Sequence, residues 1–257
     1  TMADTAVSKA PTPGRKARGG GRRPRGRGDT RAKLKIKIKN AIEGENYYLA
    51  EQLIISQFNR SKSKDLEGSL ETLVEGASDL LKAKQGNEGG SLAKAYIQEL
   101  VDNKILPDTK KIVRIQSLFA KFTKEHEKPR LEFMKEAIQW TSKLGECPHG
   151  DARLHTDLAR YYHGKNSYGL AHRHYVRGRR PTDHARLVLE WAKKGYPSER
   201  DLFIARAVLE YLCVENLKNA NEFFAAVTKT IDAETPKESE KKTSSGITTD
   251  QDRPSVD

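Results

Sequence analysis

Apolar residues recur at three- and four-residue spacing through most of this chain, and that spacing favours helices. The clearest stretch is Ser198–Thr228, where Ser198 and Asp201 predict a capping-box start. Two apolar faces follow, which we expect to be buried: Leu202, Ala205, Val208, Leu209 and Leu212, then Leu217, Ala220, Phe224 and Val227. The short connection between them predicts an antiparallel hairpin, which needs another pair to stack upon.

The preceding sequence repeats this pattern. We expect helices at about 46–58, 65–85, 91–103, 108–122, 129–144, 152–162, 167–177 and 182–194. The second carries the apolar stripe of Leu66, Leu70, Leu73, Val74, Ala77 and Leu81, and GNEGG at 86–90 is expected to break the chain after it. The sequence therefore predicts an all-α fold of stacked helical hairpins.

One segment is ambiguous between strand and helix. Leu34, Ile36 and Ile38 alternate with lysines, as in a strand, but Leu34, Ile38 and Ile42 are four apart and would line a helix. We favour the helix, because the chain shows no second strand pattern with which this one could pair.

The net charge of +12 is unevenly distributed. Residues 1–40 hold thirteen Lys or Arg against Asp4 and Asp29, whereas residues 229–257 hold five basic and seven acidic groups. We predict a disordered Arg/Gly-rich tail at 1–31, an α-solenoid domain at 32–228 and a disordered polar tail at 229–257, because the two tails lack apolar residues to bury.

The cellular compartment follows from cysteines and hydropathy. Cys147 and Cys213 are the two cysteines, and no signal-peptide core begins the sequence, so we expect a reducing compartment. No apolar run approaches the roughly 20 residues that cross a bilayer. We predict a cytosolic protein without a membrane span, with a nuclear pool as the alternative.

Enzymatic motifs are not found in the sequence. Gly164-Lys165 has Ala159 where a P-loop needs its first glycine, and no Gly-x-Ser-x-Gly elbow occurs. The carboxylates are spread among lysines, as on solvated surfaces, and Trp140 and Trp191 have the spacing of packed core residues. We predict a protein that is not an enzyme and needs no cofactor.

The densest group of metal-capable side chains is Cys147, His149, His155 and His163. A zinc site usually takes pairs of ligands from two places in the chain, and this group offers one close pair. His172 and His174 are two residues apart on a helix, so they point to different sides. We interpret CPHG as a turn between helices and predict no metal site.

Several stretches resemble one family, Golgi-to-ER traffic protein four. They are GENYYLAEQ, then Asn59-Arg60, then LVEGASDLLKAKQGNEGGSL. Ile138-Gln139-Trp140, GDARLH and AHRHYV follow, and then YPSERDLFIARAVLEYLCVENLKNAN. The resemblance covers about residues 40–228, and the order and spacing of the stretches make it specific.

The resemblance implies a right-handed α-solenoid of tetratricopeptide-like hairpins and a scaffold for delivering tail-anchored membrane proteins to the ER. In such a scaffold the N-terminal face docks a targeting ATPase. The C-terminal half holds a ubiquitin-like co-chaperone. The family continues with helices that grip this co-chaperone, whereas polar sequence follows Lys229 here, so its binding stays open at this point.

Four residues carry the expected ATPase contact. Arg60 matches a family arginine on the ATPase-facing side, and Lys62 and Lys64 follow it closely. Ser91 stands where the family generally has an acidic residue. The resemblance thus implies a charged contact at Arg60, whereas the acidic contact expected at position 91 is absent because Ser91 is uncharged.

The alternative function is a helical adaptor that associates with RNA. Basic residues of the N-terminal tail could neutralise phosphates, although no aromatic residue interleaves them for base stacking. A flexible solubilising or nuclear-import tail fits the same composition. The residues concerned are Arg15, Lys16, Arg18, Arg22, Arg23, Arg25 and Arg27.

Overall fold

The computed structural model describes residues 27–234, and they form eleven α-helices without a strand. A 3-10 turn, Pro197–Glu199, precedes α10. The all-α prediction is confirmed. The helices are α1 (Arg27–Glu43), α2 (Tyr47–Ser61), α3 (Leu66–Lys82), α4 (Gly86–Asp102), α5 (Thr109–Lys121), α6 (Glu127–Leu144), α7 (Ala152–Gly164), α8 (Tyr168–Val176), α9 (Pro181–Ala192), α10 (Arg200–Cys213) and α11 (Leu217–Glu234).

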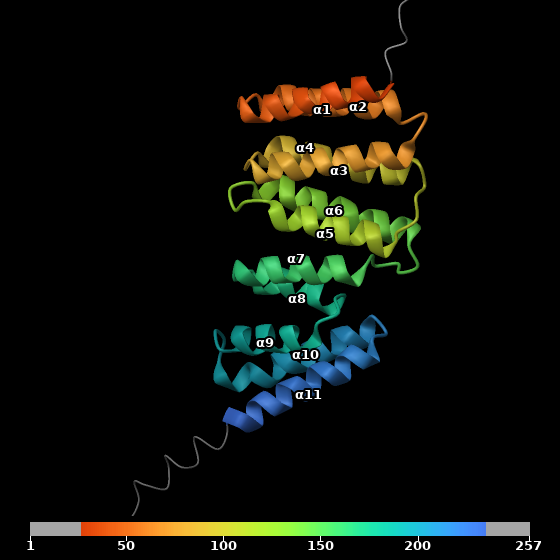
Figure 1. Ribbon diagram of the computed structural model, residues 1–257. Helices are drawn as coiled ribbons and strands as arrows, with labels where there is room; N and C mark the ends of the chain where they lie inside the picture. The colour runs from red at the N-terminus through yellow and green to blue at the C-terminus, as the bar shows by residue number, and fades with distance from the viewer. Residues whose placement is uncertain (1–26, 235–257) are drawn as a thin grey trace, which may run out of the picture.

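Successive helices run antiparallel and stack as layers of hairpins (Figure 1). Odd-numbered helices contact one another along one side, as α3 does α5 and α9 does α11. Even-numbered helices do the same on the other side, as α2 does α4 and α8 does α10. The turns that lead from one layer to the next, after α2, α4, α6, α8 and α10, therefore lie along a single edge, at the right in Figure 1.

One continuous apolar core runs through the stack. In α3 the predicted stripe is confirmed, since Leu70, Leu73, Ala77 and Leu81 are buried. Trp140 is also fully buried, and its indole Nε1 donates a hydrogen bond to the carbonyl oxygen of Ile105, 2.9 Å away. Burial of apolar side chains is the main stabilising contribution to such a stack. In a solenoid this burial occurs between neighbouring layers, since each layer contacts only the next.

Five helix ends share one turn geometry in which a non-glycine residue adopts a positive φ. In each, the following N–H bonds back to a carbonyl five residues earlier, as from Asn46 to Ala41 and from Ser167 to Tyr162. These are Schellman ends, which satisfy the last carbonyls of a helix. The residues with positive φ are Glu45, Lys84, Lys104, Asn166 and Glu215.

The predicted break at GNEGG is wrong, because α4 begins at Gly86 and includes this stretch. The glycines permit close packing instead. A Cβ on Gly86 would lie 2.1 Å from Cγ of His126, and one on Gly90 would lie 2.9 Å from Cβ of Pro129. Since the start of α4 packs this tightly on its neighbours, glycine here serves contact and does not end a helix.

Two expectations for α10 are also wrong. No side chain caps its start, which follows the 3-10 turn, so Ser198 and Asp201 form no capping box. The buried face of α10 is Ile204, Ala207 and Tyr211, whereas most of the predicted face is exposed. The helix is apolar on two sides, and neighbouring layers cover only one of them.

The ambiguous segment at 34–42 is helical, within α1. This helix starts at Arg27, inside the stretch assigned to the N-terminal tail, and α11 extends to Glu234, past the boundary drawn at 228. No helix within residues 27–234 is long and apolar enough to span a membrane.

Candidate partner-binding surfaces

Cations of one layer pair with carboxylates of another throughout the stack. Lys35 lies 3.1 Å from Glu75, Lys94 lies 2.9 Å from Glu132, and Arg114 pairs with Glu71. Such pairs contribute little stability each when exposed. Each pair does neutralise its own cation, so exposed cations without a carboxylate are the ones whose charge a partner could use. Further pairs are Arg160–Asp183 and Lys165–Glu127.

The basic residues predicted at the end of α2 differ in their surroundings. Lys62 Nζ lies 2.8 Å from Glu99 Oε1 and 5.5 Å from the ring centroid of Phe58, so its charge is largely matched. Arg60 and Lys64 are exposed, and their side chains pair with no other described residue. Two of the three cations are therefore available to a partner.

Ser91 is exposed, but it lies away from these cations. Lys62 contacts α4 at Glu99, eight residues after Ser91. At 1.5 Å per residue this places Ser91 about 12 Å further along the helix. The fold therefore groups Arg60, Lys62 and Lys64 at one edge and leaves Ser91 toward the other.

The predicted nucleic-acid or import residues are not part of the described structure. Arg15, Lys16, Arg18, Arg22, Arg23 and Arg25 lie outside residues 27–234, and Arg27 contributes only the first backbone position of α1.

The residues considered for zinc do not meet. Within residues 27–234 no three His, Cys, Asp or Glu side chains could hold a metal ion together. Cys147 and His149 are exposed in the loop between α6 and α7, while Nε2 of His163 lies 2.8 Å from Glu190. His155 faces His174 instead, with 2.8 Å between their Nδ1 atoms.

Four of the histidines instead form two hydrogen-bonded groups among the C-terminal layers, the first partly buried and the second buried. His155 Nε2 donates to the carbonyl oxygen of His149 at 2.8 Å, so its Nδ1 accepts from His174. Burial, followed by the neighbouring His155, lowers the pKa of His174 to about 4, and burial lowers the pKa of His155. Both rings are therefore neutral at neutral pH.

The second group joins three helices. His184 lies 2.7 Å from His172 and 2.9 Å from the hydroxyl of Tyr211, and His172 Nε2 lies 3.0 Å from Glu210 Oε2. Burial, followed by the proximity of His172, holds the pKa of His184 well below its usual range. His172 and His174 thus serve different neighbours, as their spacing predicts.

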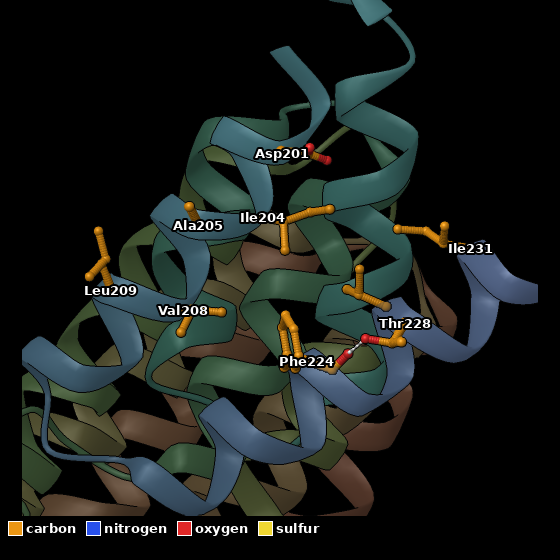
Figure 2. Close-up of a pocket in the computed structure, with 9 residues that line it drawn as sticks. Asp201, Ile204, Ala205, Val208, Leu209, Phe224, Thr228 and Ile231 are labelled. Carbon is orange, nitrogen blue, oxygen red and sulfur yellow. Dashed lines mark hydrogen bonds between the residues drawn. The ribbon is translucent and has the colours of Figure 1, made fainter. Parts of the chain in front are cut away.

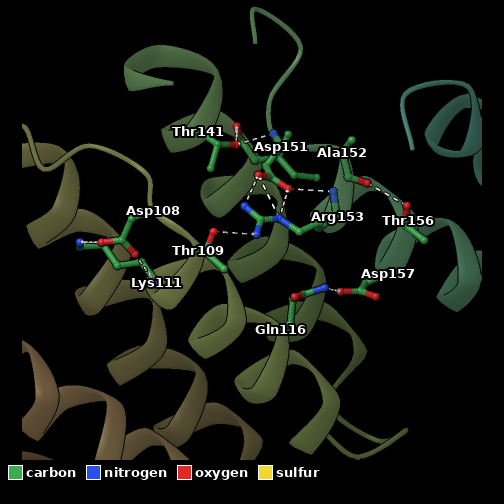
Figure 3. A network of polar contacts seen from close by, with 11 residues as sticks. Asp108, Thr109, Lys111, Gln116, Thr141, Asp151, Ala152, Arg153, Thr156 and Asp157 are labelled. Carbon is green, nitrogen blue, oxygen red and sulfur yellow. Dashed lines mark hydrogen bonds and ion pairs between the residues drawn. The ribbon is translucent and has the colours of Figure 1, made fainter. Parts of the chain in front are cut away.

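A polar network fixes the loop before α7 (Figure 3). Asp151 caps α7 by accepting from the backbone N–H of Arg153, and it also accepts from the Arg153 guanidinium at 2.8 Å. Thr141 accepts from the N–H of Asp151, and Arg153 reaches Thr109 at the start of α5. The GDARLH motif therefore positions a turn against two neighbouring helices.

The exposed side of α10 and α11 forms an apolar groove of about 490 Å³ (Figure 2). Leu209 and Phe224 project from its two sides, with 60 % and 56 % of their surfaces exposed. Val208 and Val227 also line it. Exposed apolar surface of this kind is typical of an interaction site. Leu209 and Phe224 were expected in the core, and their exposure corrects that expectation, whereas Val227 is buried as expected. The apolar residues on two sides of α10 are the sequence signal for this groove.

Comparison with known proteins gives one consistent result. The family model of Golgi to ER traffic protein 4 matches residues 63–255. The Golgi to ER traffic protein 4 homolog of Dictyostelium discoideum is 29 % identical over 184 residues, covering 71 % of this chain and 59 % of that protein. The human homolog is 27 % identical over 216 residues, covering 83 % of this chain and 64 % of the relative.

Solved structures agree. The crystal structure of C. therm. Get4 superposes with a TM-score of 0.74 at 26 % identity, and covers 80 % of this chain and 67 % of that one. The chain spans about three-fifths of the length of the first curated relatives that it matches.

Proposed function

Because the chain belongs to the Golgi to ER traffic protein 4 family, we propose that it is a non-enzymatic scaffold in the delivery of tail-anchored membrane proteins to the ER. In this role it bridges a targeting ATPase and a ubiquitin-like co-chaperone in the cytosol. The observation that carries the proposal is the family match over residues 63–255. Members of this family are generally non-catalytic.

The geometry supports a scaffold. Consecutive hairpins are held by a continuous core and by ion pairs between layers, so surfaces at the two ends of the stack keep a fixed separation. A rigid bridge raises the effective concentration of one partner for the other. The N-terminal and C-terminal layers then hold separate partners.

We assign the ATPase contact to the basic end of α2. Arg60 and Lys64 offer unpaired charge there, while Lys62 shares its charge with Glu99. An acidic surface on the ATPase would complement these cations. Since exposed charges act chiefly on encounter, they should govern association rate and its salt dependence. Ser91 belongs to this contact only if the ATPase also covers the outer side of α4.

The experiment is a charge reversal. Arg60→Glu should slow association with the targeting ATPase by about tenfold at low ionic strength, with a smaller effect at high salt. Lys124→Glu is the matched control, because Lys124 is exposed at the opposite edge, in the turn between α5 and α6. Surface plasmon resonance at two salt concentrations measures both variants.

Equal association rates for wild type and Arg60→Glu at low salt would remove Arg60 from the contact. Failure of the wild-type chain to bind the ATPase at all would overturn the scaffold function itself.

For the ubiquitin-like co-chaperone we propose the apolar groove of α10 and α11. It lies in the C-terminal layers, the half that holds this partner in the family scaffold. Its exposed Leu209 and Phe224 suit a partner with an apolar face, and covering the part of each that is now exposed would contribute about 1–2 kcal/mol.

A further inference from the structure

A second groove, of about 680 Å³, lies at the edge where turns lead from one layer to the next, and three of these turns line it. It is distinct from the basic end of α2 and from the apolar groove of α10 and α11. The three turns are the loop between α6 and α7 with Cys147, the turn between α8 and α9 with Arg177 and Arg179, and the turn between α10 and α11 with Cys213. The groove is therefore built from three consecutive layers.

This groove carries cations that the stack leaves unmatched. Arg177 and Arg179 line it, and within residues 27–234 neither guanidinium pairs with a carboxylate. Glu215 is the one carboxylate among the described lining residues. Asp151 lies near Arg179, but its oxygens already accept from Arg153. Elsewhere in the stack several cations are paired across layers, as Arg160 is with Asp183 and Lys165 with Glu127, whereas the arginines of this groove are not.

Two more arginines flank the groove. Arg173 and Arg180 are exposed on either side of the turn between α8 and α9, and no described carboxylate pairs with either one. The four arginines fall within one helical turn and one loop. Together they create a positive potential that would attract an anionic partner.

The turn that displays the arginines is held in place. The backbone N–H of Arg179 donates to the hydroxyl of Thr156 at 2.9 Å, and the Asn219 amide donates to the carbonyl oxygen of Gly178 at 3.1 Å. Arg177 Nη1 donates to the carbonyl oxygen of Arg173 at 3.0 Å. Because these hydrogen bonds already order the turn that carries the arginines, the turn loses less conformational entropy when a ligand binds.

The remaining lining distinguishes between anionic partners. Val176, Val214 and Pro148 provide apolar walls, and none of the described lining residues is aromatic except the ring of His149. Single-stranded nucleic acid is usually held by stacking its bases on aromatic side chains. A ligand that fits this groove needs carboxylates to pair with the arginines and apolar side chains to contact the walls. An acidic peptide has both.

We propose that this groove binds an acidic, partly apolar segment of a partner protein, with its carboxylates on Arg177 and Arg179. This goes beyond the scaffold function above, since neither proposed contact uses these residues. The groove would be a third partner-binding surface, besides the basic end of α2 and the apolar groove of α10 and α11.

The chain carries its own reporter for this groove. Its two cysteines, Cys147 and Cys213, are free and exposed, and they line the groove from two different turns. A bound peptide should therefore slow alkylation of both thiols by iodoacetamide, which is uncharged. Mass spectrometry follows each cysteine separately in the full chain, so binding of the same peptide to the basic N-terminal residues does not register.

The probe is a synthetic peptide of repeating Glu-Glu-Leu, with a Gln-Gln-Leu peptide and oligouridylate as comparisons. The acidic peptide should slow both alkylations several-fold at low salt, and the glutamine peptide should not. Arg177→Glu with Arg179→Glu should raise the peptide concentration needed for protection about tenfold. Lys124→Glu should keep protection, and circular dichroism should show the same helicity for all variants.

The proposal is overturned if the acidic peptide leaves both thiols unprotected, or if the double reversal protects as well as wild type. It is also overturned if oligouridylate protects at lower concentration than the peptide. Each result is independent of ATPase binding, so the scaffold function can fail or stand separately.

Discussion

Helices α3 and α10 carry similar apolar patterns but bury different fractions of them. In α3 Leu70, Leu73 and Leu81 are at most 4 % exposed, whereas in α10 Leu202 and Leu209 are 67 % and 60 % exposed. Both helices contact three others, α2, α4 and α5 for α3 and α8, α9 and α11 for α10. Those neighbours bury a broad face of α3 but only Ile204, Ala207 and Tyr211 of α10. An amphipathic pattern therefore shows that a helix has a face to cover, and its place in the stack decides whether described residues cover it.

The largest expected effect tests this contrast directly. Leu73→Ala should lower the free energy of unfolding by about 3 kcal/mol, because Leu73 is 1 % exposed and its loss leaves a cavity. Leu209→Ala should change it by about 0.5 kcal/mol or less, because Leu209 is already in solvent. Urea denaturation of the isolated chain measures both.

A large loss of stability in Leu209→Ala would contradict this contrast, because it would mean that Leu209 is covered in solution. The cover would be either another part of the same chain or a second copy of the chain on α10. Sedimentation at two protein concentrations separates these cases.

The next effect concerns acid. Six of the seven histidines lie at or after His149, and those at 155, 172, 174 and 184 have lowered pKa values from burial. Between the folded pKa, about 4 for His174, and 6.5 the unfolded chain binds more protons. Stability is therefore complete above pH 6.5 and falls as the pH drops toward 4, by about 3 kcal/mol for a group shifted as far as His174.

We expect this loss to appear first in the C-terminal layers. Hydrogen exchange at pH 7 and pH 5 should show α8–α10 opening at the lower pH while α3 and α4 stay protected, with rates corrected for intrinsic exchange. Uniform opening of all layers would contradict a local origin. His174→Gln should reduce the pH dependence.

The smallest effect compares two glycines. Gly86→Ala should cost about 1–3 kcal/mol, because a Cβ there would meet His126 at 2.1 Å. Gly164→Ala should gain about 0.5–1 kcal/mol, because no atom lies within 4 Å of its Cβ position in α7. Thermal unfolding checks both signs, and a stabilised Gly86→Ala would remove close packing as the reason for the early start of α4.

Much of the fold follows from periodicity. Each expected helix from α2 to α9 is present, with ends shifted by a few residues, because apolar spacing of three and four reports a helical face directly. The start of α4 could not be predicted this way, since glycine usually ends helices, and its packing value depends on His126 and Pro129 from later in the chain. The Schellman ends were equally hidden, because residues such as Lys84 and Glu215 give no turn signature.

The candidate surfaces were less predictable. The family resemblance predicted Arg60 as a contact residue. Only the structure showed that Glu99 pairs with Lys62 and leaves Arg60 without a carboxylate. The groove at Arg177 brings together loops that begin near residues 147, 177 and 213, so no local pattern contains it. Charge in sequence does not reveal whether a carboxylate from another layer lies opposite.

The sequence by itself determined that this chain forms antiparallel helical hairpins, because helix formation depends on spacing within a few residues. Only the tertiary structure decided which apolar faces and which cations remain uncovered. Covering depends on neighbouring layers, and these come from residues distant in the chain.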